Sequence, residues 1–207
     1  MFKKIFKKNS EVMDLLVAWI SISICFAIVL GNYSLLDYIV SKQFVFTWSG
    51  FFTNFGLSLL ITATSFIVHE LAHKYTGIHF GAQARFIMWP AFLFMGVALA
   101  LLFGVVFVAP GAVYIFGKSH SNREDGITSM AGPVANLIMA GLFFIAAIFG
   151  APAIIVSYGL AINLWIALFN LIPFGPLDGT KIIKWNPLVW GILIAIPIAL
   201  MFAIGFF

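Results

Sequence analysis

The amino-acid sequence predicts an all-α polytopic membrane protein, with five transmembrane helices and a re-entrant segment that carries a small membrane-associated β-hairpin. The first observation behind this prediction is composition: of the 207 residues, 63% are hydrophobic and only 9% are charged. Soluble domains have roughly 25% charged residues, so the chain falls outside that class. The second observation is that the apolar residues form runs close to the roughly 20 residues that a helix needs to cross a bilayer.

Five apolar runs have the length of a transmembrane helix: residues 12–30, 51–72, 127–149, 152–172 and 187–207. The first run follows four lysines, as in a signal peptide, but it is longer than a signal-peptide core and no small-residue cleavage site follows it. We therefore interpret it as a retained helix. We expect one membrane domain over residues 1–207, with a core at 51–184, peripheral helices at 12–30 and 187–207, and no soluble regulatory domain.

A sixth apolar stretch, residues 86–116, decides the topology. If it crossed the bilayer, the basic residues that follow it would lie outside the cell. If it returns to the side it left, ten of the eleven basic residues, all but Lys42, lie on the cytoplasmic side, as the positive-inside rule expects. We therefore expect a re-entrant segment, a cytoplasmic N-terminus and a location in the cell membrane. The net charge of +4 then reflects topology and not nucleic-acid binding.

Within this stretch, residues 105–108 and 113–116 are strand-like runs separated by Ala109-Pro110-Gly111-Ala112. Pro-Gly suits the centre of a type II turn, so we expect a β-hairpin. Such backbone is tolerated at membrane depth only where protein or a wet cavity covers it. A kinked helix and a full crossing are the alternatives, because short apolar runs discriminate poorly between helix and strand.

The segment His69-Glu70-Leu71-Ala72-His73 is an HExxH motif at the end of the second apolar run. On a helix, residues four apart share a face, so His69 and His73 can bind one metal ion while Glu70 lies beside it to act on a water molecule. Ionisable groups are costly in a membrane, and a divalent cation would compensate all three. The pattern predicts a hydrolytic zinc site, and the single cysteine, Cys25, excludes a cysteine metal cluster.

Polar residues recur at helical spacing along the same run and form one stripe: Asn54, Ser58, Thr62, Ser65, His69 and His73. We expect this face to line the interior of the helix bundle and to offer water a path to the metal. The alternative for each hydroxyl is that it bonds to a backbone carbonyl or packs between helices.

The third metal ligand is expected at the end of the fourth run, where Asp178 follows Pro173 and Pro176. The two prolines prevent a regular helix, so the segment can turn Asp178 back toward the histidines. The alternative is an Asp-Gly turn at the membrane surface. Glu124 and Asp125 are weaker candidates because they lie in a polar loop.

Two asparagines in the fourth run, Asn163 and Asn170, are seven residues apart and share a helix face. Asn170 could donate to an oxyanion or hold a substrate backbone, and it could equally bond to a neighbouring helix. The small residues of Ala131-Gly132-Pro133-Val134-Ala135-Asn136, taken alone, indicate close helix packing.

The three motifs HELAH (69–73), AGPVAN (131–136) and NLIPFGPLDG (170–179) occur in this order, and together they resemble the site-2 protease family of intramembrane zinc metalloproteases. The resemblance covers residues 51–184. It implies that His69, His73 and Asp178 bind zinc, that Glu70 is the catalytic base and that Asn170 contacts the substrate or oxyanion. Thr180 departs from the family pattern, in which a second glycine often follows Asp-Gly.

The resemblance also implies an activity: a zinc metalloendopeptidase, with one Zn²⁺ per chain, that hydrolyses a peptide bond of a membrane-spanning substrate near the cytoplasmic side of the bilayer. The expected partners are that transmembrane substrate and the lipid bilayer, with no nucleic acid. An edge strand within residues 105–116 could hold the unwound substrate by β-addition. Two alternatives remain: an inactive zinc-binding membrane scaffold, and a transporter whose pathway is the polar stripe.

Overall fold

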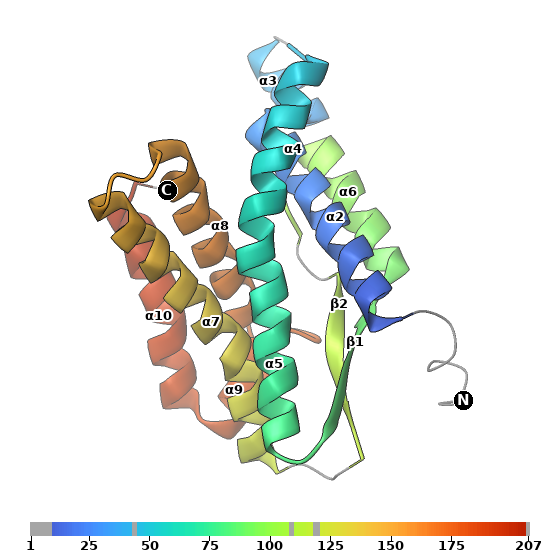
Figure 1. Cartoon of the computed structure of the whole chain (residues 1–207), viewed down its shortest axis with the longest axis vertical. Coiled ribbons are helices and arrows are strands. Elements are labelled where there is room, and N and C mark those ends of the chain that lie inside the picture. Colours follow the sequence, from blue (N-terminus) through green and yellow to red (C-terminus); the bar gives the residue numbers. More distant parts are fainter. Residues whose placement is uncertain (1–9, 43–44, 108–109, 118–120, 206–207) are drawn as a thin grey trace. The chain divides into compact units, whose positions relative to one another are not determined.

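The computed structural model describes residues 10–42, 45–107, 110–117 and 121–205. In this part of the chain, four helical segments are long and apolar enough to cross a membrane: Glu11–Ser41, Trp48–His79, Asn122–Ile148 and Ala153–Leu171 (Figure 1). These segments overlap the first four predicted spans, so the expectation of a largely helical membrane protein is confirmed. The four N-terminal lysines on which the predicted orientation partly rests lie outside the described residues.

The chain divides into two compact units, and both are built from separate stretches of sequence. The first unit contains Met1–Leu59 and Arg85–Tyr114, and the second contains Leu60–Ala84 and Ile115–Phe207. The three predicted site motifs all belong to the second unit.

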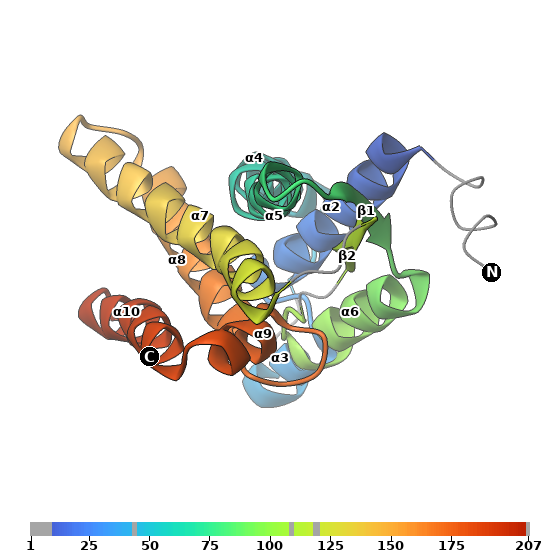
Figure 2. The same ribbon diagram turned by 90° about the horizontal axis from the view of Figure 1, so that it is seen from below.

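The first unit contains α2 (Glu11–Leu30), α3 (Leu35–Ser41), most of α4 (Trp48–Thr62) and α6 (Pro90–Phe103). Helix α2 begins after Ser10, whose hydroxyl accepts a hydrogen bond from the Met13 amide, a favourable N-cap. Helices α2 and α6 lie side by side in both views (Figures 1 and 2). Their apolar residues supply the core of this unit, which includes Ala18, Ile22, Phe26 and Ala100.

Strands β1 (Gln83–Met88) and β2 (Gly111–Phe116) form a two-stranded antiparallel sheet. The amide of Trp89 donates to the carbonyl of Pro110 at 2.8 Å, so the two ends of the intervening segment meet. Helix α6 within that segment has 14 residues, or about 21 Å at 1.5 Å per residue, which is short of the roughly 30 Å of a bilayer core. The backbone thus leaves and returns to one place, as a re-entrant segment requires. Its position in a bilayer stays a prediction.

The predicted hairpin was right about one strand and wrong about its partner. Residues 113–116 lie in β2, but residues 105–107 form no strand, position 108 lies outside the described residues, and β2 pairs with β1. Gly111 lies in β2 and not at the centre of a turn. A glycine fits there because β2 lies close to β1: a Cβ at position 111 would lie 2.6 Å from Cζ of Phe86 and 2.8 Å from Cα of Met88. The kinked-helix alternative was partly right, since α6 occupies Pro90–Phe103.

The second unit contains the π-helical segment η1 (Ala63–Ile67), α5 (Val68–His79), α7 (Asn122–Ile148), α8 (Ala153–Leu171), α9 (Asp178–Trp185) and α10 (Pro187–Ala203). Helix α7 starts with a capping box, in which Ser121 and Glu124 bond to each other's backbone amides. Its long contact with α8 is visible in Figure 2. Two clusters of buried apolar residues join α7 and α8 to α10 and α9: Ala140, Leu164 and Met201, and Leu171, Ile182 and Leu193.

The fifth predicted span, residues 187–207, corresponds to α10, a shorter apolar helix of 17 residues. The count of five transmembrane helices therefore stays a prediction, because 17 residues is at the lower limit for crossing a bilayer.

Close packing of α7 on α8 depends on Gly159, where a Cβ would lie 2.6 Å from Cε1 of Phe143. We expect Gly159→Ala to lower the free energy of unfolding by on the order of 1–3 kcal/mol, because the Phe143 ring has to move. The measurement is thermal unfolding of the purified protein in detergent. Gly141→Ala is the matched control: a Cβ there meets nothing within 4 Å, so its melting temperature should equal or exceed that of the wild type. Equal destabilisation by both variants would contradict the packing argument.

Candidate metal centre

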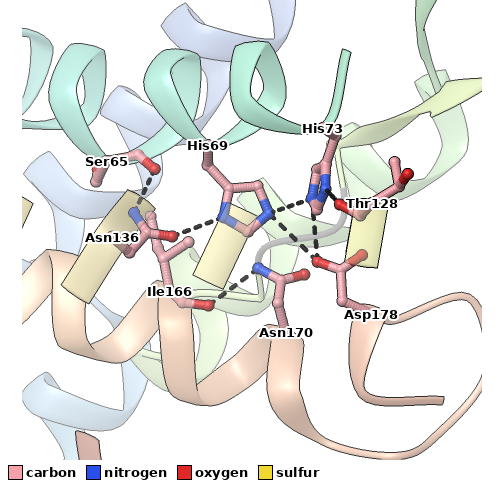
Figure 3. A network of polar contacts seen from close by, with 8 residues as sticks. All are labelled: Ser65, His69, His73, Thr128, Asn136, Ile166, Asn170 and Asp178. Atoms are coloured by element: carbon pink, nitrogen blue, oxygen red, sulfur yellow. Dashed lines mark hydrogen bonds and ion pairs between the residues drawn. The ribbon is translucent and has the colours of Figure 1, made fainter. Parts of the chain in front are cut away.

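His69 and His73 lie one turn apart on α5, and their Nε2 atoms are 3.0 Å apart (Figure 3). Both side chains are buried, with 3% and 8% of their surface exposed. The helical spacing predicted this pairing. The sequence did not reveal the π-helical turn, Ala63–Ile67, immediately before α5. Such a turn takes one extra residue, so it changes the rotation of the histidines relative to the preceding helix, and π-turns are frequent at functional sites.

Asp178 is the first residue of α9, and its Oδ2 atom lies 3.4 Å from Nε2 of His69 and 3.1 Å from Nε2 of His73. Helix α8 ends at Leu171, and the chain then passes through Pro173 and Pro176 without helical structure. The predicted unwound segment is therefore present. The alternative of a surface Asp-Gly turn is wrong, since Asp178 begins a helix and its side chain is only 13% exposed.

The short connection before α9 relies on two glycines. Gly175 has φ +57°, in the left-handed region that favours glycine. At Gly179, a Cβ would lie 2.5 Å from the carbonyl carbon of Leu171, so the first turn of α9 packs directly on the last residue of α8. This contact fixes the direction in which Asp178 leaves the backbone.

Helix α7 holds both histidines through their second ring nitrogens. Nδ1 of His69 lies 2.6 Å from Oδ1 of Asn136, and Nδ1 of His73 lies 2.7 Å from the carbonyl oxygen of Thr128 (Figure 3). A carbonyl oxygen only accepts, so Nδ1 of His73 carries a hydrogen, and in the neutral imidazole its Nε2 is left with a lone pair. Histidines that bind metals almost always donate their other ring N–H in this way.

Gly132 lets α7 approach the donor atoms closely. A Cβ at this position would lie 2.6 Å from Nε2 of His69 and would also meet Nε2 of His73. The sequence indicated only that AGPVAN packs closely; the structure shows that Gly132 and Asn136 of this motif adjoin the predicted ligands. Their spacing of four residues, which puts both on one face of α7, was the available signal.

Burial raises the pKa of Asp178, but the neighbouring charge of His73 and hydrogen bonding to His69 and His73 outweigh it, so the pKa lies below its usual range. The carboxylate is therefore ionised at neutral pH. Two imidazole nitrogens and a carboxylate oxygen thus converge, and positive charge, from a protonated imidazole or from a cation among the three, allows them to lie this close.

A zinc ion fits this donor set. Ligand atoms about 2.0–2.1 Å from zinc at the corners of a tetrahedron are about 3.3 Å apart. The three donor–donor distances of 3.0, 3.1 and 3.4 Å are close to that value. Among the described residues, one group of three or more His, Cys, Asp or Glu side chains could hold a metal ion, and it consists of His69, His73 and Asp178. Glu124 and Asp125 are not part of it; Glu124 caps α7.

Glu70 is buried beside His69, with 8% of its surface exposed. Its Oε2 atom is buried and has no hydrogen-bond partner in the described part of the chain. The nearby charges that act on it are those of His69, Asp178 and Lys181. A buried carboxylate without full hydrogen bonding is costly, which is typical of a group that acts on a ligand or water.

Asn170 lies in the last turn of α8, and Figure 3 shows its side chain next to His69 and Asp178. Its Nδ2 atom donates to the carbonyl of Ile166 at 3.0 Å and carries a second hydrogen. Asn163 has a different role, because it is fully buried and bonds to Asn136 and to the carbonyl of Gly159.

We expect Gly132→Ala to weaken zinc binding by about 10-fold or more, because the added methyl group displaces both imidazoles from Asp178. The measurement is the zinc affinity of purified protein in competition with a chromophoric chelator. Gly141→Ala, on the same helix but facing open space, should bind zinc like the wild type. Unchanged affinity in Gly132→Ala would contradict the close approach of α7.

Comparison with known proteins adds independent information, although no family model and no solved structure matches the chain. It is 37% identical over 160 residues to "Putative zinc metalloprotease MJ0611" of Methanocaldococcus jannaschii, a match over 75% of this chain and 84% of that protein. It is 33% identical to "Putative zinc metalloprotease YwhC" of Bacillus subtilis, over 61% and 67% of the two chains.

A third relative, "Putative zinc metalloprotease Rip3" of Mycobacterium tuberculosis, is 28% identical over 58% of this chain and 28% of its own length. All three relatives carry the name of a zinc metalloprotease, in agreement with the donor set on α5 and α9. With its HELAH, AGPVAN and NLIPFGPLDG motifs, the chain belongs to the same family of zinc metalloproteases, the site-2 proteases.

Proposed function

We propose that the chain is an intramembrane zinc metalloprotease that hydrolyses a peptide bond of a membrane-spanning protein near the cytoplasmic side of the bilayer. The observation that carries the proposal is the convergence of His69, His73 and Asp178 next to the buried side chain of Glu70, whose Oε2 has no hydrogen-bond partner in the described part of the chain. A structural metal site would need no such carboxylate. A base beside an open metal position is what metal-assisted hydrolysis requires.

His69, His73 and Asp178 would hold one zinc ion per chain. When bound, the ion supplies Lewis acidity, which polarises a peptide carbonyl and makes a neighbouring water more acidic. Glu70 takes a proton from that water on its free Oε2 and later gives it to the leaving amine. The second N–H of Asn170 donates to the carbonyl oxygen of the substrate as negative charge develops there.

Hydrolysis inside an apolar protein needs a place for water. Three buried hydroxyls around the ligands have no hydrogen-bond partner in the part of the chain that the structure describes: Ser65, Thr128 and Thr180. Ser65 is one turn before His69, the carbonyl of Thr128 accepts from His73, and Thr180 follows Asp178 by two residues. Buried hydroxyls of this kind usually bind internal water. They support the presence of water at the site, and Ser65 is the one that belongs to the polar stripe expected to bring it there.

The substrate and membrane placement also belong to the proposal. The N-terminus lies in the cytoplasm and the site close to the cytoplasmic face, because the ligand-bearing helices α5 and α9 carry basic residues beside the ligands: Lys74, Lys181 and Lys184. The partners are a transmembrane protein, which has to unwind locally to expose its amides, and the lipid of the cell membrane. An edge of the small sheet offers main-chain groups to such an unwound segment by β-addition.

We expect Glu70→Gln to lower the cleavage rate of a co-expressed single-span substrate by about 10²–10⁴-fold or more, because an amide cannot accept the proton. Zinc should stay bound, since Glu70 is not a ligand. Both quantities are measured on the same preparation, by gel analysis of cleavage and by metal analysis. Glu124→Gln, the same substitution at the α7 capping box, should cleave like the wild type.

Persistent cleavage by the zinc-loaded Glu70→Gln variant would overturn the assigned mechanism. Zinc-bound wild type that cleaves no single-span substrate would favour an inactive scaffold. A metal-free wild type with a transport activity would favour the transporter alternative.

We expect Asn170→Ala to lower kcat by about 10²–10³-fold with little change in KM or in zinc content, as for loss of one oxyanion donor. The measurement is steady-state cleavage kinetics in detergent, with thermal unfolding as the parallel readout. If Asn170 only joined helices, activity would fall in step with the melting temperature, and that result would remove it from the site.

A further inference from the structure

Asn136 lies on α7 at the centre of a hydrogen-bonded network that includes a predicted zinc ligand. Its side chain is fully buried. Its Oδ1 atom lies 2.6 Å from Nδ1 of His69, while its Nδ2 atom donates to the carbonyl of Ser65 at 2.6 Å and to Oδ1 of Asn163 at 3.2 Å. Figure 3 shows the contacts of this side chain with η1 and α5, and its contact with Asn163 connects them to α8.

Backbone carbonyls fix the direction of every bond in this network. The carbonyl of Gly159 only accepts, so Asn163 must turn its Nδ2 toward it, at 2.8 Å, and its Oδ1 toward Asn136. Asn136 then faces two acceptors, Oδ1 of Asn163 and the carbonyl of Ser65, and both hydrogens of its Nδ2 are used. If the Asn136 amide were flipped, its Oδ1 would face two other oxygens, Oδ1 of Asn163 and the carbonyl oxygen of Ser65.

The direction of the network determines the tautomer of His69. Because Oδ1 of Asn136 faces Nδ1 of His69, that nitrogen must carry a hydrogen, and in the neutral ring Nε2 keeps the lone pair that a metal ion needs. His73 reaches the same state through the backbone carbonyl of Thr128, which no side-chain substitution removes. The two histidines therefore differ: only the orientation of His69 depends on a side chain.

We propose that Asn136 is a positioning residue, which sets the tautomer and ring orientation of His69 so that its Nε2 can bind the metal. This inference rests on the metal site of the proposed function but not on proteolysis. A purely structural Asn136 would join the helices and would leave the protonation of His69 unspecified.

The test compares two substitutions at Asn136 with the same substitution elsewhere on α7. Asn136→Leu removes the acceptor, and we expect zinc affinity, measured by chelator competition, to fall about 10–100-fold. Asn136→Asp keeps an oxygen for His69 Nδ1 but loses both Nδ2 donors, so its zinc affinity should lie between those of Asn136→Leu and the wild type. Asn122→Leu, on the exposed first turn of α7, should bind zinc like the wild type. Wild-type affinity in Asn136→Leu, or equal loss in Asn136→Leu and Asn136→Asp, would overturn the proposal.

A spectroscopic readout on unaltered Asn136 keeps the test valid if Asn136→Leu does not fold. The chain has four histidines, so a His79→Gln/His120→Gln background leaves His69 and His73. In ¹⁵N-histidine spectra of this zinc-loaded protein, both remaining rings should carry the hydrogen on Nδ1. A His69 ring with Nδ1 unprotonated would overturn the proposal. Because neither readout involves cleavage, an inactive but zinc-binding protein would defeat the proposed function and leave this inference standing.

Discussion

Three possible metal-binding atoms lie within 3.0–3.4 Å of one another in a buried part of this protein: Nε2 of His69, Nε2 of His73 and Oδ2 of Asp178. A carboxylate oxygen and two imidazole nitrogens lie this close only with positive charge among them, from a bound cation or from a protonated imidazole. The rest of the second unit serves this requirement. Helix α5 presents two donors one turn apart, α9 presents the third at its first residue, and α7 holds the second ring nitrogens of the histidines in place.

Glycines allow this convergence because they let backbones come closer than any side chain would permit. Gly132 brings α7 against the imidazoles, and Gly179 brings α9 against the end of α8. In lipid, where apolar surface gives helices little reason to associate, small residues at helix contacts and hydrogen bonds between helices carry much of the packing. The network from Gly159 through Asn163 and Asn136 to His69 is such a case: it packs three helices and orients a ligand with the same bonds.

The polar groups of the second unit fall into two sets. One set is hydrogen-bonded and holds the donors in place: Asn136, Asn163 and the carbonyls of Ser65, Thr128 and Gly159. The other set is buried without partners in the described part of the chain: Glu70 Oε2 and the hydroxyls of Ser65, Thr128 and Thr180. The first set keeps the geometry rigid, and the second is available to water and substrate. A catalytic site in an apolar protein needs both.

The sequence by itself determined the features that depend on local spacing. Residues four apart share a helix face, so His69 and His73 were predicted as a pair; prolines end helices, so Asp178 was placed after an unwound segment; and runs of apolar residues marked the four helices that can cross a membrane. Only the tertiary structure decided which strand pairs with β2, because valine-rich runs have no unique partner until the chain has folded. It also decided that Gly132 and Asn136 adjoin the two histidines. Their contacts with the histidines span at least 59 positions in sequence, such as Asn136 with His69 across 67 positions, and no local pattern contains that information.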